Sequence, residues 1–198
     1  MTRSTFRRTV MMLTPLALLG GCVSFGGKVP DQLISLTPQS APPAGATAQG
    51  SLSDALMVLD PFTERRIDVL RVPVQINDAS VAYLKNAQWV ERPARQFRHL
   101  LAETIRAKTP GRMVVEGDDA QAIAKVKLMG RLLDLGYDAR NQSVVVRFEA
   151  MRQDGAGAAT TRRFEAVVPG VAPDAQSVAP ALNRAANDVA RQVADWVG

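Results

Sequence analysis

The stretch AIAKVKLMGRLLDLGYDARNQSVVVRFEAMR, residues 122–152, decides the fold. Each half alternates between apolar and polar side chains, and this period of two predicts two β-strands with one buried face each. The apolar sides carry Ala124, Val126, Leu128, Gly130 and Leu132 in the first half, and Val144, Val146, Phe148 and Ala150 in the second. The opposite sides carry Lys125, Lys127, Arg131, Arg147 and Glu149. The polar segment DARNQ between the halves predicts that they form a hairpin.

Further strands are predicted on both sides of this hairpin. RRFEAVV, residues 162–168, returns through the flexible turn QDGAGAATT and extends the meander. RIDVLRVPVQI, from Arg66 to Ile76, places Leu70, Val72, Val74 and Ile76 on one face. SVAYLKNAQWVE follows as another extended piece, with Lys85 and Asn86 as turn residues, and MVVE forms a short strand. Pro73 requires a position where no ladder N–H is needed.

Two segments change to the helical period. In RPARQFRHLLAETIRAKTPG, residues 92–111, the apolar side chains Phe97, Leu100, Leu101 and Ile105 recur at steps of three and four. Pro93 suits the first turn of this helix, and TPG ends it. In residues 174–197 the apolar stripe is Val178, Leu182, Ala185, Val189, Val193 and Trp196 or Val197, and the polar face is Arg184, Asn187, Asp188, Arg191 and Asp195. The predicted fold is therefore α/β, a mixed, largely antiparallel sheet of about five or six strands with two main amphipathic helices packed on it.

The N-terminus has the order of an export signal. Arg3, Arg7 and Arg8 precede VMMLTPLALL, an apolar run of about ten residues, whereas a membrane-spanning helix needs about 20. The pair Arg7–Arg8 leaves a twin-arginine route open beside the general secretory route, which we favour.

The segment LLGGC resembles a bacterial lipobox, with Leu19 three positions before Cys22, the only cysteine of the chain. The resemblance implies cleavage between Gly21 and Cys22, a diacylglyceryl group on the thiol and an N-acyl chain on the new terminus. A buried free cysteine is the alternative. Because a lone cysteine cannot close an intrachain disulfide, the exported fold depends on its core.

We predict three parts: a signal peptide (1–21), a lipidated N-terminus with a tether and a short edge strand in QLISLTP (22–50), and one domain (51–198). Residues 1–21 contain three of the 24 Lys and Arg and none of the 19 Asp and Glu, so the net charge falls from +5 to about +2 without them. This balance, without a basic stripe interleaved with aromatics, predicts no nucleic-acid partner.

The sequence predicts neither an enzyme nor a metal site. His99, the only histidine, is expected at the boundary of the core. The acidic EGDDA segment (Glu116, Asp118 and Asp119) lacks calcium-loop spacing, and GGK (Gly26–Lys28) and GAG (Gly155–Gly157) lack the context of phosphate loops. Trp89 and Trp196 are assigned to the core, although Trp89 could also serve a contact surface.

Four segments resemble the ABC-type transport auxiliary lipoprotein family: IDVLRVPVQ, VAYLKNAQWVERPARQFRHLLAETI, VKLMGRLLDL and LNRAANDVARQVADWV. They follow the lipobox and the LTP strand in the family's order, from about Gln32 to Val197. One departure is NDASVAY, which keeps only Val81 and Tyr83 of the family's pattern and leaves the subfamily open.

The resemblance implies a non-catalytic auxiliary component of an ABC-type lipid transport system in a Gram-negative envelope. Its partners would be a substrate-binding protein of the mammalian-cell-entry (MCE) type and the ABC permease and ATPase, with a homo-oligomer as an open alternative. No cofactor is implied apart from the covalent lipid on Cys22. Because Val23 and Ser24 follow the cysteine, an outer-membrane location facing the periplasm is favoured over the inner membrane. The alternative is a structural outer-membrane lipoprotein that supports envelope integrity or assembly without lipid transport.

Overall fold

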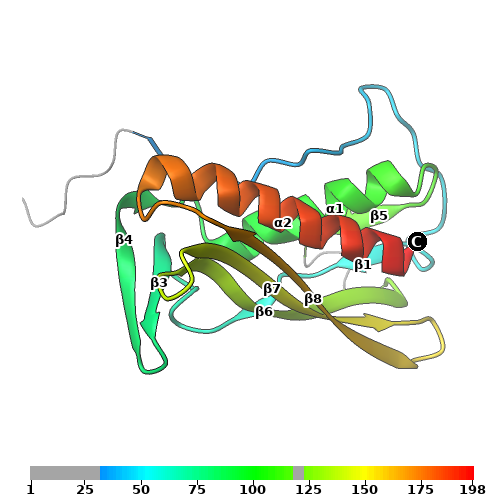
Figure 1. Ribbon diagram of the computed structural model, residues 1–198. Helices are drawn as coiled ribbons and strands as arrows, with labels where there is room; N and C mark the ends of the chain where they lie inside the picture. The colour runs from blue at the N-terminus through cyan, green and yellow to red at the C-terminus, as the bar shows by residue number, and fades with distance from the viewer. Residues whose placement is uncertain (1–31, 118–122) are drawn as a thin grey trace, which may run out of the picture.

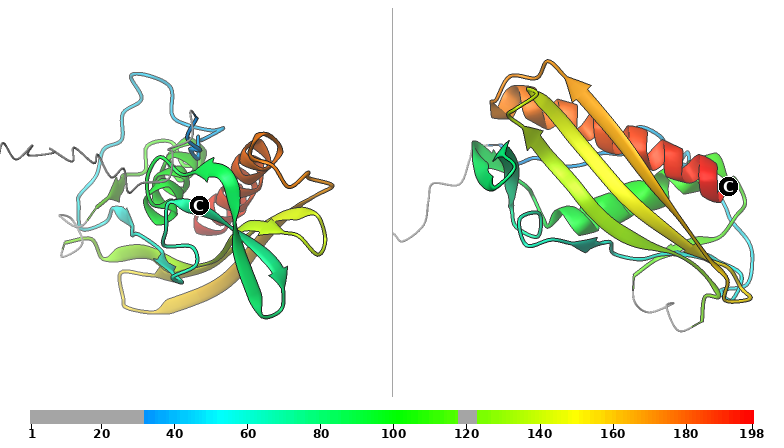
Figure 2. Two further views of the ribbon diagram at one scale, coloured as in Figure 1. Left: turned by 90° about the vertical axis from the view of Figure 1, so that its left-hand side faces the viewer. Right: turned by 60° about the horizontal axis from the view of Figure 1, so that its bottom comes forward.

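In the computed structural model, residues 32–117 and 123–198 are described, and they form a single curled sheet with two helices on one of its faces (Figures 1 and 2). The strands are β1 (Leu56–Val58), β2 (Phe62–Thr63), β3 (Arg71–Asn77), β4 (Ser80–Gln88), β5 (Val114–Glu116), β6 (Val126–Asp138), β7 (Ser143–Gln153) and β8 (Ala159–Pro169). The helices are α1 (Pro93–Lys108) and α2 (Ala175–Val197). The predicted fold class is confirmed, but the sheet is larger than the five or six strands expected.

Strands β6, β7 and β8 form a meander in which both pairings are antiparallel, and β8 is the edge strand on this side of the sheet. The predicted inner residues of β7 are buried, from Val144 to Ala150. In β6 a register shift between Leu132 and Asp134 moves the buried positions to Leu135 and Tyr137. A bulge has this effect because its extra residue reverses the alternation of the strand.

Strand β6 also has a second, parallel edge. β1, β2 and β3 each pair with a different part of β6 in parallel, and β5 continues the sheet beyond β1. Leu56, Met57 and Val58 of β1 are all fully buried, which is the pattern of a strand covered on both faces. Neither β1 nor β2 was predicted, because the apolar LMV of β1 shows no alternation and β2 has only two residues.

The two helices and the sheet share one core. α1 and α2 pack against each other, and Phe97 of α1 meets Phe148 of β7 edge to face, with ring centroids 5.2 Å apart. All the predicted stripe residues of α2 are buried, with Val197 rather than Trp196 completing the stripe. Trp196 is half-buried and packs on Phe164 of β8, whereas Trp89 is fully buried, as expected for a core residue.

The β3–β4 hairpin differs from its predicted form in three ways. The strand begins at Arg71 rather than Arg66, so Leu70 precedes it and is exposed. Val72 and Val74 are buried as predicted, but Ile76 is exposed because the hairpin extends past the core. Lys85 and Asn86 lie within β4 rather than at a turn. Asn86 has φ of +54° in the part of β4 where the register with β3 is irregular.

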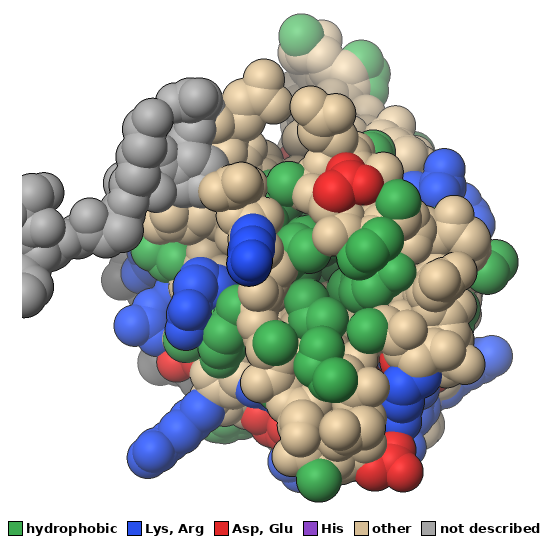
Figure 3. Space-filling model, turned by 60° about the vertical axis from the view of Figure 1, so that its left-hand side comes forward, with side chains coloured by type: hydrophobic (Ala, Val, Ile, Leu, Met, Phe, Trp, Pro, Cys, Tyr) green, Lys and Arg blue, Asp and Glu red, His purple; other side chains and the backbone are tan. Residues whose placement is uncertain are grey.

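Several large hydrophobic side chains at the hairpin end are exposed to solvent. Figure 3 shows apolar side chains gathered on this end of the molecule, with Lys and Arg side chains beside them. The exposed residues that belong to the hairpin or to its base are Leu33, Leu70, Ile76, Val81 and Val90.

Candidate functional site

The predicted lipidation and cleavage residues, Cys22 and Gly21, lie outside the described residues, as do the GGK segment and Asp118 and Asp119. The described chain starts at Gln32, so the site that can be built from contacts is the place where the predicted tether joins the domain. This place is at the hairpin end (Figure 1).

The first contact of this segment is with the end of β4. Ile34 forms an isolated parallel bridge with Trp89 rather than the predicted short strand. The Ile34 N–H donates to the carbonyl of Gln88 at 2.7 Å, and the Val90 N–H donates to the carbonyl of Ile34 at 2.9 Å. Ile34 and Leu36 are buried and belong to the core, so the domain's core includes residues from the N-terminal segment.

Amide side chains from both helices then bind the backbone of this segment. Gln96 of α1 accepts a hydrogen bond from the Leu36 N–H at 2.8 Å. Asn183 of α2 accepts one from the Thr37 N–H at 2.8 Å. We call these contacts, with those of Asn187 described next, the N-terminal clamp.

Asn187 makes the most complete contact of the N-terminal clamp. Its Oδ1 accepts from the Gln39 N–H at 2.8 Å, and its Nδ2 donates to the Thr37 carbonyl at 3.0 Å and to the Asn183 carbonyl at 2.8 Å. Asn187 is only 5% exposed, which corrects its assignment to the solvent face of α2. The helical period alone cannot show that residues 37–39 cover this position.

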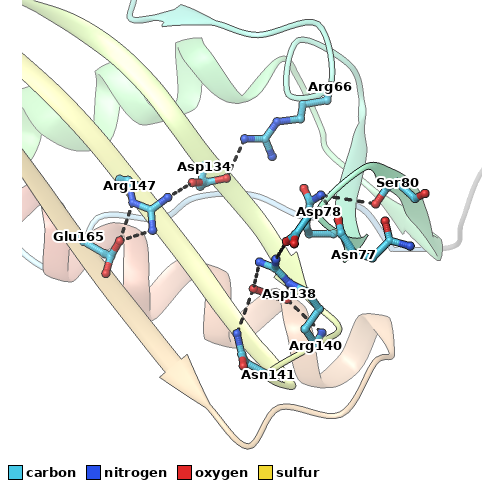
Figure 4. Close-up of polar contacts among 11 residues, drawn as sticks. Arg66, Asn77, Asp78, Ser80, Asp134, Asp138, Arg140, Asn141, Arg147 and Glu165 are labelled. Atoms are coloured by element: carbon cyan, nitrogen blue, oxygen red, sulfur yellow. Dashed lines mark hydrogen bonds and ion pairs between the residues drawn. The ribbon is translucent and has the colours of Figure 1, made fainter.

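A polar cleft of about 250 Å³ lies between the β3–β4 hairpin and β6–β7. Asp134 of β6 accepts from Arg66 at 2.7 Å and from Arg147 of β7 at 2.5 Å, and Arg147 also pairs with Glu165 of β8 (Figure 4). Arg66 further donates to the Leu133 carbonyl at 2.6 Å. These contacts join the loop before β3 to three strands of the meander.

A second set of ion pairs holds the tip of the hairpin. Arg140, in the β6–β7 turn, donates to Asp138 at 2.7 Å and to Asp78 at the end of the hairpin (Figure 4). The hydrogen bonds from the Arg140 guanidinium lower the pKa of Asp138 to about 2. The arginines and carboxylates named in the cleft are thus engaged with one another in a network of ion pairs.

His99 lies in a cluster with two glutamates that was not predicted from the sequence. Ligand atoms of His99, Glu103 and Glu116 lie within 4.8 Å of one another. Arg106, however, contacts Glu103 at 2.5 Å and Glu116 at 2.8 Å, and Arg98 lies 3.4 Å from Glu116. A divalent cation would have to displace these guanidinium groups, so the cluster is an ion-pair network.

The position of His99 corrects the expectation that it lies at the boundary of the core. Its side chain is 57% exposed, with Nδ1 3.5 Å from a Glu116 oxygen. The spacing of His99 and Glu103, four residues apart on α1, was the signal that could have predicted that they meet.

The sequence matches the model of a known protein family. The model described as the ABC-type transport auxiliary lipoprotein component matches residues 35–194, which is most of the chain. The chain belongs to this family. The match includes the N-terminal clamp, the whole sheet, α1 and all but the last three residues of α2. No curated protein matches the sequence.

Two solved structures show the same fold at low sequence identity. The protein XCC0632 from Xanthomonas campestris, assigned to the family DUF330, superposes with a TM-score of 0.67 and 19% identity over 84% of this chain and 94% of that one. A crystal structure titled only as an uncharacterized protein gives a TM-score of 0.64 and 14% identity, over 77% and 97% of the two chains. The PelC dodecamer from Paraburkholderia phytofirmans is more distant, with a TM-score of 0.43 and 17% identity over 76% and 92%.

Neither of the helices in residues 32–117 and 123–198 is long and apolar enough to cross a membrane. The auxiliary lipoprotein family is associated with ABC transport systems of the cell envelope.

Proposed function

We propose that this auxiliary lipoprotein is a non-catalytic subunit of an ABC-type lipid transport system in a Gram-negative envelope. It would act beside an MCE-type substrate-binding protein, a permease and an ATPase. The observation that carries this proposal is the N-terminal clamp. Residues 36–39, close to the start of the described chain, are hydrogen-bonded to side chains of both helices. A force applied to the anchor would thus be transmitted directly to the core of the domain, as a subunit that attaches a complex to a membrane requires.

The anchor in this proposal is a lipid on Cys22, with cleavage after Gly21. One acyl chain gives marginal membrane binding, whereas two or three, at about 0.8 kcal/mol per buried methylene, give stable attachment. Val23 and Ser24 favour the outer membrane, with the domain in the periplasm.

Labelling with palmitate tests the anchor. We expect Cys22→Ser to abolish label incorporation and to leave an unprocessed precursor, because serine lacks the nucleophilic thiolate. Ser24→Ala is the matched control and should be labelled and processed normally. Normal labelling of Cys22→Ser would disprove the lipid anchor.

Co-purification tests the transport role. The lipidated protein, extracted in mild detergent, should recover an MCE-type protein with the permease and ATPase. Recovery of outer-membrane assembly or envelope proteins without any ABC subunit would instead support a structural envelope lipoprotein.

A further inference from the structure

The exposed apolar residues of the hairpin end form a surface that the core does not use. Of the nine large hydrophobic side chains that stand out as exposed in the described chain, five belong to this end: Leu33 (45%), Leu70 (39%), Ile76 (44%), Val81 (40%) and Val90 (53%). We call these five residues the apolar end. Large exposed patches of this kind mark contact surfaces for proteins or membranes, whereas single exposed apolar residues need no explanation.

Backbone hydrogen bonds bring these residues together from separate parts of the chain. The Trp89 N–H donates to the Leu70 carbonyl, and the Val90 N–H donates to the Ile34 carbonyl, so Leu70, Val90 and Leu33 meet at the base of the hairpin. Val81 pairs with Gln75, next to Ile76, nearer the tip. The five residues therefore lie between the base of the hairpin and its tip, and Figure 3 shows apolar side chains gathered on this end of the molecule.

Basic side chains accompany this apolar surface. Arg71, Lys85, Arg92 and Arg95 are exposed on the hairpin and on the first turn of α1. The acids nearby are Asp68, which pairs with Arg92 at 2.7 Å, Glu91, and Asp78 at the hairpin tip, which is paired with a further basic residue, Arg140. Arg71 lies over the ring of Tyr83, with its guanidinium carbon 3.9 Å from the ring centroid. An apolar surface with an excess of basic residues matches the boundary between anionic headgroups and acyl chains.

The predicted anchor attaches at this same end. Nine residues lie between Cys22 and Gln32, so even a fully extended tether reaches only about 35 Å over these ten Cα–Cα steps. The β7–β8 turn lies at the other end of the eleven-residue strand β7, about 35 Å along the sheet. Because the tether enters at the hairpin end, the apolar end can reach the bilayer however short the tether is, whereas the β7–β8 turn can reach it only when the tether is extended.

From these observations we propose that the apolar end rests on the lipid surface that holds the Cys22 lipid, with its apolar side chains at the headgroup boundary. This inference rests on the proposed lipidation of Cys22. The contact orients the domain, because the acyl chains already supply the attachment. The β7–β8 turn and the far end of α2 then point away from the membrane, toward the partner subunits.

The lipidated full-length protein is suited to a direct test, because its only native cysteine is the acylated one. An environment-sensitive fluorophore is attached at Val81→Cys or Val90→Cys, and at Ala156→Cys in the β7–β8 turn as the matched control. Each protein is reconstituted into vesicles of phosphatidylethanolamine and phosphatidylglycerol, with or without brominated phosphatidylcholine as the quencher.

We expect about twofold quenching at positions 81 and 90 and almost none at position 156, since interfacial side chains lie about 5–10 Å into the headgroup boundary. Equal quenching at all three positions, or none at 81 and 90 in vesicle-bound protein, would overturn the proposal. A fluorescence shift at position 81 that is the same with and without brominated lipid, but disappears when the protein is diluted, would also overturn it. Such a shift would mean that a second copy of the protein covers the apolar end. A different outcome is that the unsubstituted protein fails to float with vesicles while its Cys22 thiol reacts with the fluorophore. That result would overturn both the lipid anchor and the membrane contact. The other failures leave the anchor intact.

Discussion

The N-terminal clamp and the β3–β4 hairpin are both peripheral pieces held on the same core, but they are held by different chemistry. Residues 34–39 are fixed by apolar burial and by neutral amides, with Asn187 almost completely buried. The hairpin is fixed by partly exposed ion pairs around Asp134 and Asp138 and by a close backbone approach at Gly136.

This difference determines how each attachment should respond to its surroundings. Buried neutral hydrogen bonds depend little on salt or pH, and leaving one partner unpaired is costly. Partly exposed ion pairs are screened by salt and weaken when a carboxylate is protonated. The attachment that leads toward the predicted anchor is therefore the one that is least sensitive to ionic conditions.

The largest effect is expected from Gly136→Ala. A Cβ atom there would lie 2.5 Å from the Pro73 carbonyl oxygen, where β3 pairs with β6 in parallel, so the backbone of one strand must move. We expect a loss of about 3 kcal/mol in the free energy of unfolding, measured by urea denaturation. Gly155→Ala is the matched control, because its Cβ would have its nearest neighbour at 3.7 Å. Equal stability of both variants would show that the contact between Gly136 of β6 and Pro73 of β3 does not fix the hairpin.

Asn187→Ala should have the next largest effect. It leaves the Thr37 carbonyl and the Gln39 N–H without their protein partner, which is expected to cost about 2 kcal/mol. Limited proteolysis should then cut near residues 37–39, while the hairpin stays protected. Asn183→Ala, at a more exposed contact, should lose about 1 kcal/mol. A variant of Asn187 as stable as the wild type would mean that the N-terminal clamp contributes nothing.

Asp138→Asn tests the ionic attachment through pH. Because the pKa of Asp138 is lowered from 3.8 to about 2 in the fold, its contribution is complete above about pH 4 and is lost as the pH falls toward 2. After allowance for solvent screening we expect the variant to be about 1 kcal/mol less stable at pH 6. In urea titrations this difference should shrink at pH 2.5. A difference that is the same at both pH values would rule out the Arg140 pair as its source.

The smallest effect is expected from Asp78→Ala. Its side chain is 96% exposed, and exposed ion pairs contribute about 0.5 kcal/mol or less. In low salt, hydrogen exchange at the hairpin tip should be slightly faster in the Asp78→Ala variant than in the wild type. In 0.5 M salt the Debye length is only about 4 Å, so the two proteins should exchange at the same rate. Exchange at residues 34–39 should be unaffected by either change. A change in exchange at residues 34–39 as well as at the hairpin tip would show that the two attachments are not independent of each other.

The parts of the fold that the sequence predicted are those with a long, regular period. The β6–β7–β8 meander and the two helices follow from their spacing of apolar residues, as Val144 to Ala150 and Val178 to Val193 illustrate. Leu56–Val58 has no alternation because both faces of β1 are covered. The start of β3 was placed too early because Leu70 fits the alternation although it precedes the strand.

The candidate site was less predictable, since it depends on contacts between distant segments. Asn187 looks like a solvent-facing residue in its helix, and only the path of residues 37–39 shows otherwise. His99, Glu103 and Glu116 meet because β5 returns beside α1, and only the spacing of the first two was visible in the sequence. Cys22 remains a prediction from its sequence context alone.

The N-terminal clamp also constrains when the chain can fold. The bond between Asn187 and the Thr37 carbonyl joins residues 150 positions apart, and the core that Leu36 enters is closed by α2. The native structure cannot be completed before the last helix has been made, and contacts of such long range form slowly. A chain that completes its packing late remains unfolded for longer during synthesis, which would suit export by the general secretory route that residues 1–21 predict.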